Sequence, residues 1–123
     1  HVCLLRQYRH SIGKWSWELP AGVIEKGEQP ITTAKRELRE EAGLEANEWQ
    51  PLFSILPTPG FCNEELFLYQ ARHLTAVGTT PNADEQIEVH WKPLKEVLEM
   101  AVDGRIRDAK TIAALFRATH FST

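Results

Sequence analysis

Three glutamates in one short stretch, Glu37, Glu40 and Glu41, have the type and spacing to do chemistry. On a helix, at about 100° per residue, Glu41 lies about 40° to one side of Glu37 and Glu40 about 60° to the other. Their Cβ atoms would be about 5–6 Å apart, so the three like charges repel one another. A divalent cation relieves that repulsion, and oxygen-only ligands suit Mg²⁺, with Mn²⁺ as the alternative. The pattern therefore predicts metal-assisted chemistry on a diphosphate.

The same three residues also have a simpler explanation. A solvated helix face could pair Glu40 and Glu41 with the neighbouring cations Lys35, Arg36 or Arg39. The spacing of the carboxylates alone leaves both explanations open, and the surrounding residues must decide between them.

A helix from residue 30 to residue 42 is expected to carry the glutamates. Pro30 suits the first helical position, and Gly43 suits the cap beyond the last turn. The apolar residues that fall on one stripe of this helix are Ile31, Ala34, Leu38 and Ala42.

The rest of the chain mixes strands and helices without regular alternation. Asp108 is expected to cap a last helix, whose apolar residues facing the core would be Ile112, Leu115 and Phe116. This mixture predicts an α/β or α+β sandwich with a mixed sheet. The other expected elements are extended segments over 2–8, 17–24, 49–56, 65–74 and 86–91 and a helix over 93–102.

Length and composition limit the class of protein. The 123 residues, 42% hydrophobic and 25% charged, suit one globular domain, and a net charge of −3 argues against a nucleic acid polymer as partner. No apolar run is long enough for a membrane span. Cys3 and Cys62 match no zinc or disulfide spacing, which favours a reducing cytoplasm. The chain opens at His1 without Met, so we expect a single domain, residues 1–123, that lacks N-terminal residues.

Fixed intervals surround the glutamates. Five residues separate Gly22 from Glu28, and seven more lead to 36–38. A single residue separates 36–38 from 40–41, and another separates 40–41 from 43–44. Over these 23 residues the chain resembles the Nudix box of the Nudix hydrolases at every defined position. The resemblance implies an α/β/α sandwich with a mixed sheet and the box as loop–helix–loop. It also implies hydrolysis of a nucleoside diphosphate linked to another moiety.

The resemblance implies a role for individual residues of the box. Glu37, Glu40 and Glu41 would bind the metal together with the carbonyl of Ala21, which a tight turn at Gly22 would place. Arg36 would orient a glutamate, either Glu28 or Glu37, and Gly43 would end the helix in a left-handed conformation. Glu28 could be a metal ligand or a supporting residue.

Residues outside the box resemble the ADP-ribose pyrophosphatase subgroup. Residues 7–9 with 17–22 resemble its opening, and Pro59 lies sixteen residues after Gly43, where that subgroup has a marker proline. The resemblance implies hydrolysis of ADP-ribose to AMP and ribose 5-phosphate by a protein that is commonly a homodimer. The implied substrate residues are Arg9, Glu18, Pro59 and Glu64, and the implied catalytic base is Glu85.

Each of these assignments has an alternative. Arg9 could be a surface cation, Glu18 an outward strand residue and Pro59 a rigid turn, while Glu64 and Glu85 could be solvated carboxylates. The substrate could instead be another sugar nucleotide, a dinucleoside polyphosphate or a damaged nucleotide. A non-catalytic nucleotide-sensing domain is a further alternative, against which the intact carboxylates argue.

Overall fold

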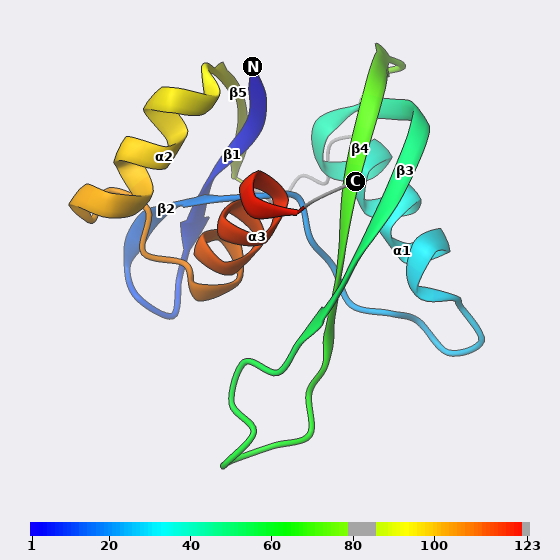
Figure 1. The fold of residues 1–123 in the computed structure, drawn as a ribbon, viewed down its shortest axis with the longest axis horizontal. Helices are drawn as coiled ribbons and strands as arrows, with labels where there is room; N and C mark the ends of the chain where they lie inside the picture. The colour runs from blue at the N-terminus through cyan, green and yellow to red at the C-terminus, as the bar shows by residue number, and fades with distance from the viewer. Residues whose placement is uncertain (79–85, 122–123) are drawn as a thin grey trace.

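The structure, a computed structural model, describes residues 1–78 and 86–121 (Figure 1). Its mixture of helices and strands confirms the α+β class. Within these residues, no helix has both the length and the apolar character that crossing a membrane requires. The elements in chain order are β1 (Val2–Arg9), β2 (Lys14–Glu18), α1 (Pro30–Glu37), the π-helical turn η1 (Leu38–Ala42), β3 (Leu44–Ile55), β4 (Leu66–Ala76), β5 (Ile87–Lys92), α2 (Leu94–Asp103) and α3 (Ala109–His120).

The strands form two sheets. One has the order β2-β1-β5, and the other is the β3–β4 hairpin. Strand β1 places Leu5 opposite Glu18 on one side and opposite Val89 on the other. Every strand pairing of the described residues is antiparallel, so the parallel pairing that a mixed sheet needs is not seen among them. The short connection between β1 and β2 dictates this direction for that pair.

Strand β1 is buried on both faces, because successive side chains of a strand point to opposite sides. Leu4 and Leu5 are each 0% exposed. Leu4 packs against α2 and α3, whereas Leu5 packs against η1 and the start of β3. Figure 1 shows α2 and α3 on one side of the three-stranded sheet and α1 with the β3–β4 hairpin on the other. The layers therefore form the predicted sandwich.

The helix that carries the glutamates differs from the predicted single α-helix over 30–42. The α-helical part ends at Glu37, and the chain continues as a π turn to Ala42. The N–H of Gly43 bonds to both Arg39 and Leu38 carbonyls, and Gly43 has the predicted left-handed conformation at φ 66°. A π turn takes one more residue per hydrogen-bonded ring than an α turn, so it changes the angles between Glu37, Glu40 and Glu41.

The predicted core face of the last helix is partly wrong. Leu115 is 5% exposed, but Phe116 is 65% exposed and stacks on His120 at a ring-centroid distance of 4.5 Å. Ile112 is 37% exposed. Thr111 and Leu115, four residues apart, are the buried residues of α3, and Phe116 lies about 100° further round the helix axis.

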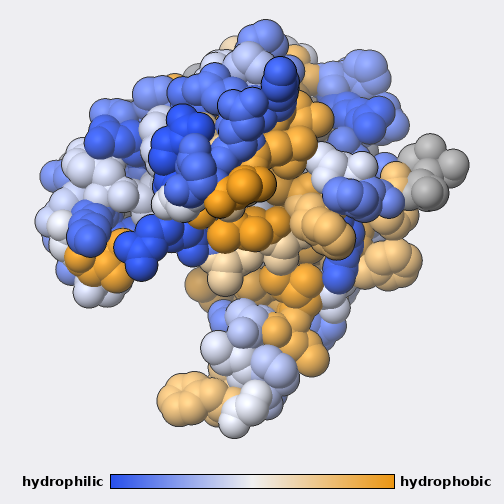
Figure 2. Space-filling model, turned by 60° about the vertical axis from the view of Figure 1, so that its left-hand side comes forward, coloured by the Kyte–Doolittle hydropathy of each residue, from blue (hydrophilic) through white to orange (hydrophobic). Residues whose placement is uncertain are grey.

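The β3–β4 hairpin forms an arm that projects from the sandwich (Figure 1). Strand β3 begins at Leu44, five residues earlier than predicted from Trp49, and β4 reaches Ala76. Large apolar side chains are exposed at the arm: Phe53 is 73% exposed, Leu56 56% and Phe61 93%. Figure 2 shows apolar surface along this arm.

Candidate active site

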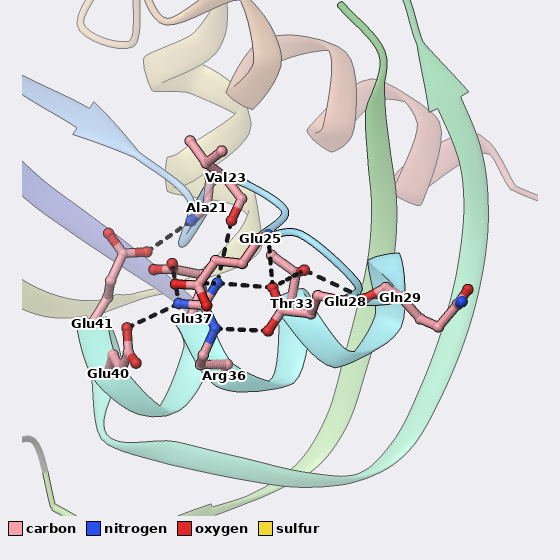
Figure 3. Close-up of polar contacts among 10 residues, drawn as sticks. All are labelled: Ala21, Val23, Glu25, Glu28, Gln29, Thr33, Arg36, Glu37, Glu40 and Glu41. Atoms are coloured by element: carbon pink, nitrogen blue, oxygen red, sulfur yellow. Dashed lines mark hydrogen bonds and ion pairs between the residues drawn. The ribbon is translucent and has the colours of Figure 1, made fainter.

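Arg36 lies at the centre of the box carboxylates (Figure 3). Its Nε donates to Oε2 of Glu28 at 2.9 Å and its Nη2 to Oε1 of Glu28 at 3.0 Å. Its Nη1 donates to Glu37 at 2.8 Å and to Glu40 at 3.2 Å. The predicted pairing of Arg36 with Glu28 or Glu37 is confirmed, and both carboxylates take part. One guanidinium therefore offsets the mutual repulsion of three carboxylates.

Glu28 is a supporting residue in this arrangement. Besides Arg36, its Oε1 accepts from the hydroxyl of Thr33 at 2.6 Å and from the backbone N–H of Glu25 at 3.1 Å. These bonds, first of all those from Arg36 and then that from Thr33, lower the pKa of Glu28 to about 2. The carboxylate joins the loop before α1 to the middle of the helix.

The loop before α1 and the glutamates of the helix are interlocked. A Cβ atom on Gly22 would lie 2.0 Å from Cδ of Glu37, so only a glycine leaves room for that carboxyl group. The backbone N–H of Ala21 donates to Oε1 of Glu41 at 2.9 Å. Close approach, rather than the tight turn expected from the sequence, explains the glycine, because Gly22 lacks a positive φ.

A cavity of about 660 Å³ adjoins this loop and helix. It brings Glu37 and Glu41 of the box together with Arg9, Glu64 and other residues distant in the sequence. The residues that line it are Gln7, Tyr8, Arg9, His10, Ala21, Gly22, Val23, Glu37, Glu41, Pro57, Glu64, Leu66, Gln86, Ile87, Asp108, Ala109 and Lys110.

A buried carboxylate, Glu18, binds two cations at the edge of this cavity. Its side chain is 3% exposed and accepts from Nε and Nη2 of Arg9 at 2.8 and 2.6 Å. Nζ of Lys110 donates to it at 3.1 Å. Burial alone would raise the pKa of Glu18, but Arg9 and Lys110 outweigh burial and lower it to about 2. Glu18 does not line the cavity, whereas Arg9 does, with 45% of its side chain exposed.

The oxygen donors of the box have the chemistry that a hard divalent cation needs. Glu37 and Glu41 line one cavity, and the backbone of Ala21 lies beside Glu41. Within the described residues, no three side chains of His, Cys, Asp or Glu already converge as a ligand group. Arg36 and the N–H of Ala21 bond to the carboxylates instead. Glu40 adds a further carboxylate whose side chain is 55% exposed, so the chemistry of the donor set fits such an ion.

Comparison with known proteins decides the family. A sequence model of the NUDIX domain matches residues 1–115. The chain belongs to the NUDIX domain family. It is 38% identical over 126 residues to an ADP-ribose pyrophosphatase of Mycobacterium tuberculosis. That match covers 100% of this chain and 60% of the relative. It is 37% identical to a methanol dehydrogenase activator of Bacillus methanolicus, over 93% of this chain and 63% of that protein.

A solved structure supports the fold of this NUDIX domain. The crystal structure of an ADP compounds hydrolase superimposes with a TM-score of 0.88 and 24% sequence identity, over 98% of this chain and 65% of that one. The chain thus spans less than two thirds of the length of these relatives, at 60% and 63% of the two curated proteins.

Some of the expected substrate residues of the NUDIX domain line the cavity, and others lie outside its lining. Arg9 and Glu64 line the cavity with the box glutamates. Pro59 is exposed and lies outside the cavity lining, in which Pro57 takes part instead. Glu85 lies outside the described residues.

The sequence pattern does not indicate several of the residues that line the cavity. Tyr8 and His10 come from the β1–β2 hairpin, with their rings 4.9 Å apart. Lys110 follows Asp108, whose predicted capping role is confirmed, since its side chain accepts from the N–H of Thr111 at 3.1 Å. The pair of Glu18 and Lys110 spans 92 residues, and no local pattern indicates it.

Proposed function

We propose that this NUDIX domain hydrolyses the diphosphate bond of ADP-ribose, releasing AMP and ribose 5-phosphate. One observation carries the proposal: Glu37 and Glu41 line the same cavity as Arg9. The cavity thus has an oxygen-rich wall for a metal ion and a cationic group for an anion. The name of the relative from Mycobacterium tuberculosis, ADP-ribose pyrophosphatase, supports this choice of substrate.

The box glutamates Glu37, Glu40 and Glu41, with the carbonyl of Ala21, would hold Mg²⁺, or Mn²⁺ in its place. When bound, such an ion supplies charge neutralisation for a diphosphate and a lowered pKa for a bound water. Arg36 orients Glu37 through the bond of 2.8 Å, and Gly22 leaves room for that carboxyl group. The chain's own contribution is to place several oxygen donors on one wall of the cavity.

Arg9 and Glu64 would contact the substrate. Arg9 pairs with the phosphate or ribose, and the loop that contains Pro59 carries Glu64 to the cavity. Glu18 was expected to touch substrate, but both of its oxygens are bonded to Arg9. We therefore propose that Glu18 supports substrate binding by orienting Arg9.

Glu85 would be the base that takes a proton from the attacking water. A carboxylate can take such a proton when it lies within hydrogen-bond reach of the water. Glu85→Gln is expected to lower kcat by about 10²- to 10⁴-fold with little change in KM. Glu64→Gln is expected to act mainly on KM, and the opposite pattern would assign the base to Glu64.

A substrate panel with Mg²⁺ tests the proposed activity. ADP-ribose, a GDP-sugar, a dinucleoside polyphosphate and an oxidised nucleoside triphosphate are compared by kcat/KM. We expect ADP-ribose to be preferred, and equal turnover of all four would overturn the assignment. Binding of ADP-ribose without hydrolysis, at saturating Mg²⁺ or Mn²⁺, would instead identify a nucleotide-sensing domain.

We further propose that the protein works as a homodimer in the cytoplasm. The exposed apolar side chains of the arm, Phe53 and Phe61 among them, would be covered in such a dimer. Free Cys3 and Cys62 suit a reducing compartment. Sedimentation equilibrium of the purified protein tests the dimer, and a monomer at micromolar concentration would contradict it.

A further inference from the structure

Lys110 connects the last helix to the buried end of β2. Its Nζ donates to Oε1 of Glu18 at 3.1 Å and to Oδ1 of Asp108 at 2.9 Å. Burial would lower its pKa, but Asp108 and Glu18 outweigh burial and raise it, so Lys110 stays charged. The side chain is 28% exposed and lines the cavity, although it belongs to neither the box nor the β1–β2 hairpin.

We propose that Lys110 is a positioning residue for substrate binding: it immobilises Glu18, and Glu18 in turn directs Arg9 into the cavity. The inference rests on the proposed role of Arg9 as a group that contacts the substrate anion.

The two oxygens of Glu18 accept hydrogen bonds from different atoms of Arg9 and Lys110. Oε2 accepts from Nε of Arg9, and Oε1 accepts from both Nη2 of Arg9 and Nζ of Lys110. One edge of the guanidinium is used in this way. Its remaining nitrogen, Nη1, makes no hydrogen bond within residues 1–78 and 86–121. Three of the five N–H groups of Arg9, including both on Nη1, therefore remain for an anion, in an orientation that depends on the plane of the Glu18 carboxylate.

The start of α3, from which Lys110 reaches Glu18, is held in place by further hydrogen bonds. Oδ2 of Asp108 accepts from the N–H and the hydroxyl of Thr111 at 3.1 and 2.6 Å. The same hydroxyl accepts from the N–H of Leu19 at 3.1 Å. Thr111 is 0% exposed, so a buried hydroxyl links the first turn of α3 to the residue that follows β2. Arg9 lies at the end of β1, beside an exposed turn. Among the described residues, Glu18 is the only partner to which the Arg9 side chain donates a hydrogen bond.

Kinetics of Lys110→Met and Lys110→Arg test the inference in the full chain. With ADP-ribose and saturating Mg²⁺, Lys110→Met is expected to raise KM roughly tenfold, the scale of one charge-assisted hydrogen bond, and to leave kcat within about twofold. Lys110→Arg should restore most of the affinity. The control is Lys95→Met on α2, an exposed lysine outside the cavity, which should match the unaltered protein.

A second background separates positioning from direct contact. In an Arg9→Met chain, adding Lys110→Met should raise KM no further, because the group that Lys110 serves is gone. A full additional tenfold rise would show that Lys110 acts on the anion itself and would overturn the inference. Equal loss of kcat and affinity in both Lys110 variants would also overturn it, as a merely structural effect.

Nuclear magnetic resonance of Arg9 provides a readout without substrate. The Nε–H proton of Arg9 should exchange with solvent several-fold faster in Lys110→Met and unchanged in Lys95→Met, because its bond to Glu18 loosens. Unchanged exchange would overturn the inference. If the unaltered chain does not hydrolyse ADP-ribose, the proposed function fails, and this measurement alone decides whether Lys110 positions Arg9.

Discussion

The carboxyl group of Glu37 fills the space in which a side chain on Gly22 would begin. A Cβ atom at position 22 would lie 2.0 Å from Cδ, 2.2 Å from Oε1 and 2.3 Å from Cγ of Glu37. All three atoms belong to a side chain rather than to backbone. The conflict would therefore be relieved by moving the glutamate, not by unfolding the loop.

Gly22→Ala should consequently remove activity while leaving the fold intact. Displacing Glu37 by about 1 Å is expected to lower kcat/KM by about 100-fold. The midpoint of thermal unfolding should change little, since the three atoms nearest to the added Cβ all belong to the Glu37 side chain. Gly60→Ala is the matched control, because no atom lies within 4 Å of a Cβ there. A large loss of stability in Gly22→Ala would contradict the argument.

Glu41→Gln tests the metal-binding wall of the cavity. Removing its charge should lower kcat at least about 100-fold and shift the Mg²⁺ concentration needed for half-maximal rate upward. The fold should survive, since an amide oxygen can still accept from the N–H of Ala21. Initial rates across a Mg²⁺ titration measure both effects. Glu45→Gln, on an exposed carboxylate beyond the helix, is the control, and equal rates for the two variants would refute the assigned wall.

The ion pairs of Glu18 make the free energy of unfolding depend on pH at acidic pH. Its pKa of about 2 lies below that of an unfolded glutamate, about 4.3, so the unfolded chain binds the proton first. The stabilisation is complete above the unfolded value and is lost as pH falls through about 2. Between these values the free energy of unfolding should rise with pH more steeply in the unaltered protein than in Glu18→Gln, by up to about 1.4 kcal/mol per pH unit. Urea unfolding at several pH values measures the slope, and identical slopes would contradict the ion pair.

Arg117 secures the arm that brings Pro57 and Glu64 to the cavity. Its Nη1 donates to the carbonyls of Leu52 and Ser54 at 2.9 and 2.8 Å, on either side of Phe53, which has a φ of 62°. The strand pairing shifts register between Pro51 and Ser54, and α3 supplies a donor to both carbonyls at this irregularity.

Arg117→Met should remove the hydrogen bonds that the guanidinium donates to those two carbonyls. We expect a loss of about 2 kcal/mol in the free energy of unfolding, the scale of a hydrogen bond from a charged donor. Amide hydrogen exchange should accelerate along the arm more than in β1. The control is Arg107→Met, an exposed arginine in the loop before α3. Equal stability of both variants would show that the arm does not need this contact.

Much of the candidate site follows local rules that can be seen in the sequence. The apolar stripe of the box helix, Pro30 at its start and Gly43 at its end, depend on residues within a few positions of one another. The pairing of Arg36 with Glu28 likewise bridges eight residues, which one loop and two helical turns can close. The capping of α3 by Asp108 has the same short range.

Other features depend on contacts between distant segments, and the sequence contains no signal for them. The π turn at Leu38–Ala42 interrupts a pattern that reads as one α-helix, and Leu38 and Ala42 pack against Leu5 of β1. Phe116 is exposed because packing of α3 buries Leu115 on a different face. Only the folded sandwich decides which side of a helix meets a sheet.

The acidic helix and its box intervals were determined by the sequence alone, since metal-ligand spacing on a helix is a matter of a few residues. The tertiary structure decided which residues share the cavity with that helix. Glu18 and Lys110 are 92 residues apart, and Leu52 and Arg117 are 65 apart. Such pairs form only when β1, β2, the arm and α3 pack together, because chain folding, not sequence spacing, sets the distance between their side chains.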